Sequence, residues 1–362
     1  MTMIFISLLL SVVVSGLALA VLLRLAPQTG LMDYPGDRRR LHREAIPRIG
    51  GLGIFIGILA SLVAVPPQTP AELYGLTGAV LLVLVGALDD RFQLGARLRL
   101  VAQIGAALLL TLGGGVVITQ LGDLLGSGPV MLGAWAVPFT LLAIVGLINA
   151  FNMVDGIDGL AGGLTLITLG SLLFFLPTGS WLYLLLISTL AALVPYLICN
   201  LDLCRCPCKI FLGDAGSMLL GYLIVWGLIE ASRSPEGIMP ITAIWLTAVP
   251  LMDTLAVIMR RLKNGLHPFS ADRGHLHHLL ARHFHSTRHA LVLLLLLATL
   301  LAGMGIMGLA LDIAEAHMFY LAMGIYALYL WILGKVPRMY RRRLMNRTKK
   351  SKILLTLDGK RC

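Results

Sequence analysis

The sequence predicts an all-α polytopic integral membrane protein. Three observations support this: its composition, its long apolar segments and the distribution of its basic residues. Of 362 residues, 58% are hydrophobic and only 13% are charged, whereas soluble domains carry about 25% charged residues. A soluble protein of this length needs more polar surface. Disordered chains, disulfide scaffolds and nucleic-acid-binding domains are therefore disfavoured.

A window of about 19 residues detects eleven apolar segments, which we interpret as transmembrane helices. They cover residues 3–24, 49–66, 73–89, 98–120, 132–150, 159–176, 181–199, 215–231, 239–260, 290–311 and 317–335. The signals are weakest in segments 49–66, 132–150 and 159–176, where glycine, proline or motif residues interrupt or flank the segment. Ten spans is therefore the alternative count. The first segment is too long for a signal-peptide core and no basic residue precedes it, so we expect a retained helix.

The positions of the basic residues predict the orientation. If the N-terminus is outside, 28 of the 29 Lys and Arg residues fall in inner connections or in the C-terminal tail, and only Arg233 is outside. Cytoplasmic loops are enriched in Lys and Arg, so we expect an outer N-terminus and a cytoplasmic C-terminus. The net charge of +11 is then a topology signal and gives no indication of nucleic-acid binding.

The predicted organisation is one membrane domain over residues 1–336 and a basic cytoplasmic tail over residues 337–362. The connections expected on the cytoplasmic side cover residues 25–48, 89–97, 150–158, 200–214 and 261–289.

Acidic residues on the predicted inner side are not explained by topology. Twelve of the 18 acids lie at or near that side, and six stand where a helix end meets a loop: Asp89, Asp90, Asp155, Asp158, Asp214 and Asp253. Burying a carboxylate there costs several kcal/mol unless it is paired or binds a cation. Salt bridges to nearby arginines are one explanation. The clustering of six acids on one side favours a metal-phosphate site.

The pairs Asp89–Asp90 and Asp155–Asp158 are predicted to be arranged differently. Asp89 and Asp90 are neighbours at a helix end and point about 100° apart, so one would face a metal or acceptor while the other meets Arg97 or solvent. Asp155 and Asp158 would share one face if their segment is helical.

The segment 209–217 combines Lys209, Phe211 and Asp214 with a turn of small residues that opens an apolar span. Free N–H groups at such a helix start suit a phosphate. Asp214 suits Mg²⁺, and Phe211 offers a face on which a base could stack.

The loop over residues 261–289 adds imidazoles. His275 and His278 are spaced i,i+3 and follow Arg273. Phosphate contact, a zinc site and plain surface all remain open, although the acid-rich surroundings favour a hard cation with oxygen ligands. The first inner loop carries His42 within a basic run. That run would attract an anionic headgroup or nucleotide phosphates, or it only marks the inner side.

Together these residues indicate phosphoryl transfer, which depends on charge neutralisation by metal, carboxylate and cationic groups. An inner-face site would join a soluble nucleotide-linked donor to a lipid phosphate. The rival from another class is a lipid transporter or flippase, which predicts ionisable residues near the bilayer midplane. The centres of the predicted spans are almost free of charge, which favours the enzyme.

Four motifs, in this order, resemble the polyprenyl-phosphate N-acetylhexosamine-1-phosphate transferase superfamily, the glycosyltransferase 4 family. They are Gly-Ala-Leu-Asp-Asp-Arg-Phe at 86–92, Asn-Ala-Phe-Asn-Met-Val-Asp-Gly-Ile-Asp-Gly-Leu at 149–160, Phe-Leu-Gly-Asp-Ala-Gly-Ser at 211–217 and Pro-Phe-Ser-Ala-Asp-Arg-Gly-His-Leu-His-His at 268–278. The Val-Asp-Gly at 154–156 and the interrupted histidines at 275–278 favour the N-acetylglucosamine branch over the phospho-muramoyl-pentapeptide branch.

The resemblance implies transfer of N-acetylglucosamine 1-phosphate from UDP-N-acetylglucosamine to undecaprenyl phosphate, with Mg²⁺, or Mn²⁺ in its place. It also implies a bacterial inner membrane, a cytoplasmic active site and a role in starting lipopolysaccharide O-antigen or a related polysaccharide. Another UDP-N-acetylhexosamine or UDP-muramoyl-pentapeptide is the alternative donor. Further expected partners are membrane lipid and a second copy of this chain in a homodimer.

The resemblance also assigns roles. Asp214, together with Asp89, would hold the metal, Asp89 or Asp90 would activate the lipid phosphate, and His278 would complete the catalytic set. The expected substrate-binding residues are Asn152, Asp155, Asp158, Lys209, Phe211, Arg273, His275, His277, Arg97 and His42.

Overall fold

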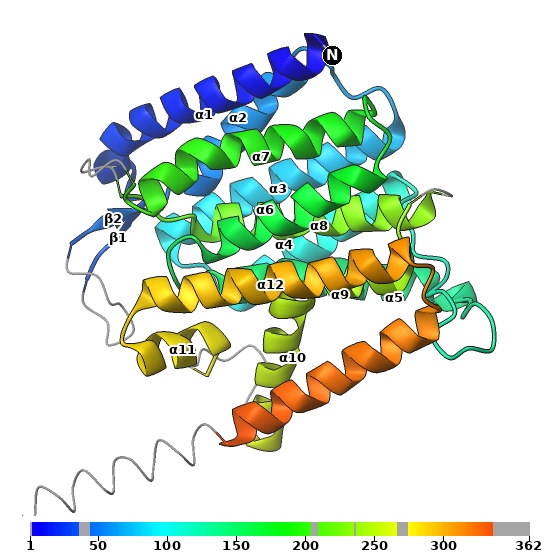
Figure 1. Cartoon of the computed structure of the whole chain (residues 1–362). Helices are drawn as coiled ribbons and strands as arrows, with labels where there is room; N and C mark the ends of the chain where they lie inside the picture. The colour runs from blue at the N-terminus through cyan, green and yellow to red at the C-terminus, as the bar shows by residue number, and fades with distance from the viewer. Residues whose placement is uncertain (1, 36–43, 204–208, 235–236, 266–273, 336–362) are drawn as a thin grey trace, which may run out of the picture.

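The computed structural model describes residues 2–35, 44–203, 209–234, 237–265 and 274–335. These residues form a bundle of helices with one two-stranded ribbon, in which β1 (Met32–Asp33) pairs antiparallel with β2 (Ile46–Pro47) (Figure 1). The prediction of an all-α membrane protein is confirmed. His42 and Arg273 lie outside the described residues.

Each of the eleven predicted apolar segments coincides with helix. The helices are α1 (Thr2–Thr29), α2 (Gly50–Leu62), α3 (Pro70–Phe92), α4 (Ala96–Leu108), η1 (Leu109–Gly113), η2 (Gly133–Trp135), α5 (Ala136–Val154), α6 (Leu160–Leu172), η3 (Leu173–Phe175), α7 (Trp181–Asn200), α8 (Gly213–Arg233), α9 (Pro240–Leu246), α10 (Ala248–Lys263), α11 (Leu276–Phe284), α12 (Thr287–Ala310) and a last helix, Glu315–Lys335.

Not every apolar segment is long enough to cross a membrane. Among the described residues, eight helices pass by length and composition, and a ninth if the bent pair α9–α10 counts as one span. Helix α2 has 13 residues, about 20 Å at 1.5 Å per residue, against a hydrocarbon core of about 30 Å. The helix formed by α6 and η3 is also short. The eleven predicted segments are thus helical, but two of them are too short to be full spans.

Helix α8 is the centre of the bundle. It packs against α3 and α5 and, less extensively, against α2 and α6, and it is buried from Ala215 to Ile229. A helix that is apolar on all sides is covered either by other helices or by lipid, and around α8 the neighbouring helices cover it. The N-terminal end of α8 therefore has a fixed position relative to the surrounding helices.

Two glycines let neighbouring helices approach the start of α8. A side chain at Gly51 of α2 would collide with the backbone of Gly216, and one at Gly86 of α3 would collide with the backbone of Ala215. Small residues at such crossings let helix backbones pack closely. These contacts place the chain just before α2 and the C-terminal end of α3 beside the first turn of α8.

Helices α9 and α10 meet at a bend of 81°, so α10 runs across the direction of the other long helices (Figure 1). Pro250 stands in the first turn of α10 and has no N–H to donate to the carbonyl of Leu246, four residues earlier. That carbonyl instead accepts a hydrogen bond of 2.9 Å from the hydroxyl of Thr168. The carbonyl left free at the bend is therefore satisfied by another helix of the protein. A helix interrupted inside a membrane requires this, because no water is available there.

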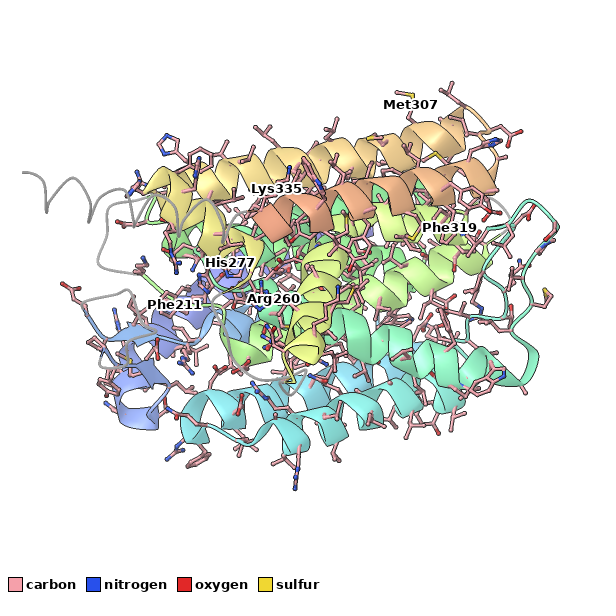
Figure 2. All side chains as sticks on the ribbon, turned by 90° about the horizontal axis from the view of Figure 1, so that it is seen from below. Phe211, Arg260, His277, Met307, Phe319 and Lys335 are labelled. Carbon is pink, nitrogen blue, oxygen red and sulfur yellow. The ribbon has the colours of Figure 1, made fainter. Side chains whose placement is uncertain are left out.

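The connections predicted to share one side do converge. Residues from all five predicted inner connections line one cavity. In Figure 2, Phe211 and His277 lie toward that end of the bundle, and Met307 and Phe319 lie toward the other.

Candidate active site

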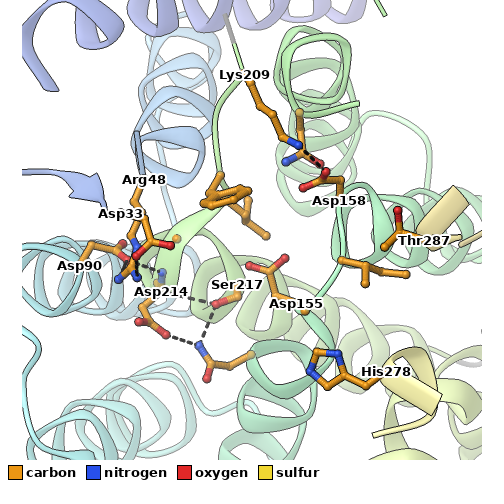
Figure 3. A pocket seen from close by; sticks show the side chains of 17 residues that line it. Asp33, Arg48, Asp90, Asp155, Asp158, Lys209, Asp214, Ser217, His278 and Thr287 are labelled. Atoms are coloured by element: carbon orange, nitrogen blue, oxygen red, sulfur yellow. Dashed lines mark hydrogen bonds and ion pairs between the residues drawn. The ribbon is translucent and has the colours of Figure 1, made fainter. Parts of the chain in front are cut away.

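The candidate site is a cavity of about 520 Å³ at this end of the bundle (Figure 3). It is lined by Asp33, Arg48, Asp90, Asn152, Asp155, Gly156, Ile157, Asp158, Asn200, Lys209, Phe211, Leu212, Gly213, Asp214, Ser217, His278 and Thr287. The lining combines carboxylates with cationic groups, and most of these side chains come from helix ends and the loops between them. Eight of the predicted site residues are in this lining.

Asp90 fixes the start of α8. Its carboxylate accepts hydrogen bonds from the backbone N–H groups of Asp214 (3.0 Å) and Ala215 (3.2 Å). The turn opens with Gly213 at φ +76°, where a side chain would be strained and would also collide with Asp90. The expectation that these N–H groups are free to bind phosphate is therefore wrong, because a carboxylate of this chain already occupies them.

Arg48 reaches the same carboxylate from the opposite side. The segment before α2 pairs with the chain before α8: Phe211 N–H donates to Pro47 C=O at 2.8 Å, and Gly50 N–H donates to Phe211 C=O at 2.9 Å. This pairing holds the Arg48 guanidinium 3.7 Å from Asp90 and 2.5 Å from Asp33. The Arg48 guanidinium thus stands at the cavity wall close to two carboxylates.

Asp89 and Asp214 share a second arginine. Nη1 of Arg99 lies 3.0 Å from Asp89 Oδ2 and 3.3 Å from Asp214 Oδ1. The prediction that Asp89 and Asp90 have different environments is confirmed. The partner of Asp89 is Arg99, however, and Arg97 is exposed and stands outside the cavity lining.

Asn152 connects α5 to α8. Its side-chain amide donates to Asp214 Oδ1 at 2.5 Å and to Ser217 Oγ at 2.9 Å. Asp214 therefore presents one oxygen to two donors from this chain, Asn152 and Arg99. Its side chain remains 22% exposed toward the cavity, so a bound group can reach it.

Asp155 and Asp158 lie on a turn, because α5 ends at Val154 and α6 begins at Leu160. They do not share a helix face, yet both line the cavity. Asp158 pairs with Lys209 at 2.7 Å. Burial, followed by the negative charges of Asp214 and Asp158, raises the pKa of Asp155 to about 7. Its protonation state therefore changes near neutral pH.

The histidines lie on and just before α11. His275 is the residue before the helix and, like His277, is buried, whereas His278 lines the cavity. The ring of His277 lies 5.5 Å from that of His275 and 4.2 Å from that of His278. Burial, and next the electrostatic interaction with the neighbouring His278, lowers the pKa of His277 to about 3. His277 is therefore neutral at ordinary pH, and its ring lies against Gly156 of the cavity lining.

Sequence reasoning did not single out several residues of the site, among them Arg48, Arg99 and Ser217. Arg48 and Arg99 are among the basic residues of the predicted inner connections, and Ser217 ends the motif 211–217. What was missing was the spatial contact, because each partner is distant in sequence.

The side chains of this cavity suit the binding of phosphates. Arginine and lysine groups offer cationic donors, and carboxylate oxygens at one end of the cavity suit a hard divalent cation. Asp155, Asp158 and Phe211, which line the same cavity, offer acceptors and an aromatic face.

Comparison with known proteins agrees with the family resemblance of the four sequence motifs. The model of glycosyl transferase family 4 matches residues 73–232. The chain is 38% identical to an undecaprenyl-phosphate alpha-N-acetylglucosaminyl 1-phosphate transferase of Yersinia pestis, covering 91% of this chain and 92% of that protein. Proteins of the same description match from Escherichia coli strain K12 (40% identity, 78% of each chain) and from Haemophilus influenzae (35%, covering 93% and 96%). Because the similarity to these relatives extends over nearly the whole chain, this protein belongs to glycosyl transferase family 4.

Proposed function

We propose that this protein transfers N-acetylglucosamine 1-phosphate from UDP-N-acetylglucosamine to undecaprenyl phosphate, giving undecaprenyl-pyrophosphoryl-N-acetylglucosamine and UMP. The observation that carries the proposal is that Asp90, Asp214 and Arg48 line the same cavity as Asp155 and Phe211. The names of the relatives supply the identity of the sugar and the lipid. Starting O-antigen or related polysaccharide synthesis is the proposed role.

The proposed site faces the cytoplasm of a bacterial inner membrane. The loops around the cavity are those richest in Lys and Arg, and such loops are retained on the cytoplasmic side. There a soluble UDP-sugar and a lipid phosphate headgroup can reach the same cavity.

The residues present fit a magnesium ion. Asp89 and Asp214 direct oxygens from two helices toward one cationic group, the Arg99 guanidinium. Within the described ranges, no group of three or more His, Cys, Asp or Glu residues is arranged to hold a metal. Mg²⁺ commonly takes one or two carboxylates and completes its shell with substrate phosphates and water. We propose that Asp214, with Asp89, would hold Mg²⁺ or Mn²⁺, which when bound neutralises charge on the pyrophosphate.

In the proposed reaction, an oxygen of the lipid phosphate forms a bond to the sugar-bearing phosphorus of the donor, and the bond to the UMP oxygen breaks. Asp90 lines the cavity and is oriented by two backbone N–H groups. In this proposal Asp90 accepts a remaining proton from the lipid phosphate. Arg48 and His278 would stabilise negative charge on the transferring phosphates.

The direct test uses purified protein with radiolabelled UDP-N-acetylglucosamine and undecaprenyl phosphate. We expect labelled lipid and UMP in equal amounts with Mg²⁺ or Mn²⁺, and neither product after chelation of the metal. UDP-N-acetylgalactosamine and UDP-muramoyl-pentapeptide, used in parallel, test the sugar. Absence of UMP release with every donor and metal would exclude the proposed activity and favour the flippase alternative.

Gly156 gives a narrower prediction. A side chain here would collide with the ring of His277, so Gly156→Ala should displace the turn carrying Asp155 and Asp158. We expect the donor KM to rise about tenfold, since overpacking costs about 1–3 kcal/mol. Initial rates against donor concentration measure the effect. Gly170→Ala, which meets no atom within 4 Å, is the matched control. An unchanged donor KM in Gly156→Ala would show that the turn does not bind the donor.

A further inference from the structure

Asp253 joins three elements outside the cavity. It lies in α10 and is 2% exposed. Its Oδ2 lies 2.8 Å from His275 Nδ1, and its Oδ1 accepts hydrogen bonds from Leu276 N–H at 2.8 Å and from the Tyr329 hydroxyl at 2.9 Å. This buried carboxylate thus links α10, on which it lies, to the start of α11 and to the last helix.

These contacts fix the start of α11. His275 is the residue preceding the helix, and Leu276 is its first residue. The Asp253 carboxylate therefore satisfies one of the backbone N–H groups that a helix start leaves unpaired. Arg260, two turns further along α10, donates to the carbonyl of Gly274 at 3.0 Å, so α10 holds the entrance to α11 at two points.

Helix α11 depends on such anchoring. It has nine residues, too few for a helix to be stable by itself. His277 is its fully buried side chain, and Leu276, Leu280 and Ala281 are only partly buried against the core. The face it presents to the cavity carries His278. A small rotation of α11 would move His278 relative to Asp214 and Asp155.

Tyr329 brings the last helix into this arrangement. Only 11% of the most apolar window of that helix is buried, and the helix lies beside α10 (Figure 1). The Tyr329 hydroxyl nevertheless donates to Asp253, while the neighbouring Tyr326 hydroxyl contacts Met259 Sδ at 3.3 Å. The two tyrosine rings lie 6.4 Å apart, so Tyr326 is a matched control with a similar setting.

We propose that Asp253 and Tyr329 are positioning residues that hold α11 so that His278 points into the cavity. The consequence for turnover rests on the proposed function, whereas the hold on α11 does not. Neither residue lines the cavity, so both act through α11. The last helix is thereby assigned a part in the site although it lies outside the family match at residues 73–232.

The first experiment needs no substrate. Amide hydrogen exchange over residues 276–284 is compared in the full-length protein, Tyr329→Phe, Asp253→Asn and the control Tyr326→Phe. We expect faster exchange of α11 in the first two variants and unchanged exchange in Tyr326→Phe. Unchanged exchange in both Tyr329→Phe and Asp253→Asn would overturn the proposal, whatever the activity of the protein.

The second experiment separates positioning from general stability. Loss of one hydrogen bond to a carboxylate should lower kcat about tenfold in Tyr329→Phe, with little change in the donor KM or in thermal unfolding. In a His278→Gln background the same substitution should have no further effect on kcat, because its effect passes through His278. An equal loss in both backgrounds would contradict positioning. If no variant or parent transfers sugar phosphate, the proposed function fails and the exchange result still decides the hold on α11.

Discussion

Replacing Asp214 by asparagine should lower kcat for sugar-phosphate transfer about a thousandfold while the protein still folds. Asparagine keeps the shape of the side chain but removes the charge that faces the cavity and, in our proposal, the metal. Loss of one preorganised electrostatic group commonly costs about 10²–10³ in turnover. Release of labelled UMP measures the effect, and thermal unfolding in detergent tests the fold.

The control for this variant is Arg233→Gln. Arg233 pairs with Glu230 at the opposite end of α8, so its replacement should leave transfer unchanged. If Asp214→Asn retained parental activity at ordinary Mg²⁺ concentration, the proposed metal ligand would be wrong. Parental activity that returns only at raised Mg²⁺ would instead support a weakened metal site.

Replacing Gly51 by valine should prevent α2 from packing against α8. A side chain at this position would meet backbone atoms of Gly216, which cannot rotate away as a flexible side chain can. Overpacking costs about 1–3 kcal/mol where side chains can adjust and more where they cannot. We expect little folded protein after extraction and a lowered unfolding temperature. Fluorescence-detected size-exclusion chromatography with a thermal ramp measures both.

Gly303→Val in α12 is the matched control, because nothing lies within 4 Å of the position that a Cβ would occupy there. Equal behaviour of the two valine variants would contradict the close crossing of α2 and α8. A monodisperse Gly51→Val protein that had lost only activity would place the effect at the Arg48 segment instead of in the packing.

The sequence was sufficient to predict the helices because long apolar segments in a membrane protein have few other stable forms. The sequence was less informative about the lengths of the helices and about where a helix changes direction. Helix α2 is too short to cross, and the bend before α10 combines Pro250 with a hydroxyl from Thr168, which is 78 residues away from its acceptor in sequence. A window of hydropathy detects apolar character but does not detect a carbonyl that is satisfied by another helix.

The site was predictable to the extent that acids at helix ends are costly unless used or paired. Asp90, Asp155, Asp158 and Asp214 were predicted for this reason, and they line one cavity. Their hydrogen-bond partners were not predictable. The contact of Asp90 with the Asp214 N–H joins positions 124 residues apart, and only the packed structure shows that this carboxylate, and not a phosphate, occupies the start of α8.

The hydrogen bond from the Asp214 N–H to the Asp90 carboxylate restricts which parts of the cavity wall can change. Asp90 and Asp214 are coupled through the main chain, so neither can be shifted without moving the first turn of the most buried helix. The opposite wall, formed by the turn 155–158, Lys209 and Thr287, belongs to loops and helix ends that tolerate change. We therefore expect donor selectivity to respond to substitutions in the turn 155–158, at Lys209 or at Thr287. The wall formed by Asp90 and Asp214 should stay the same for different donors.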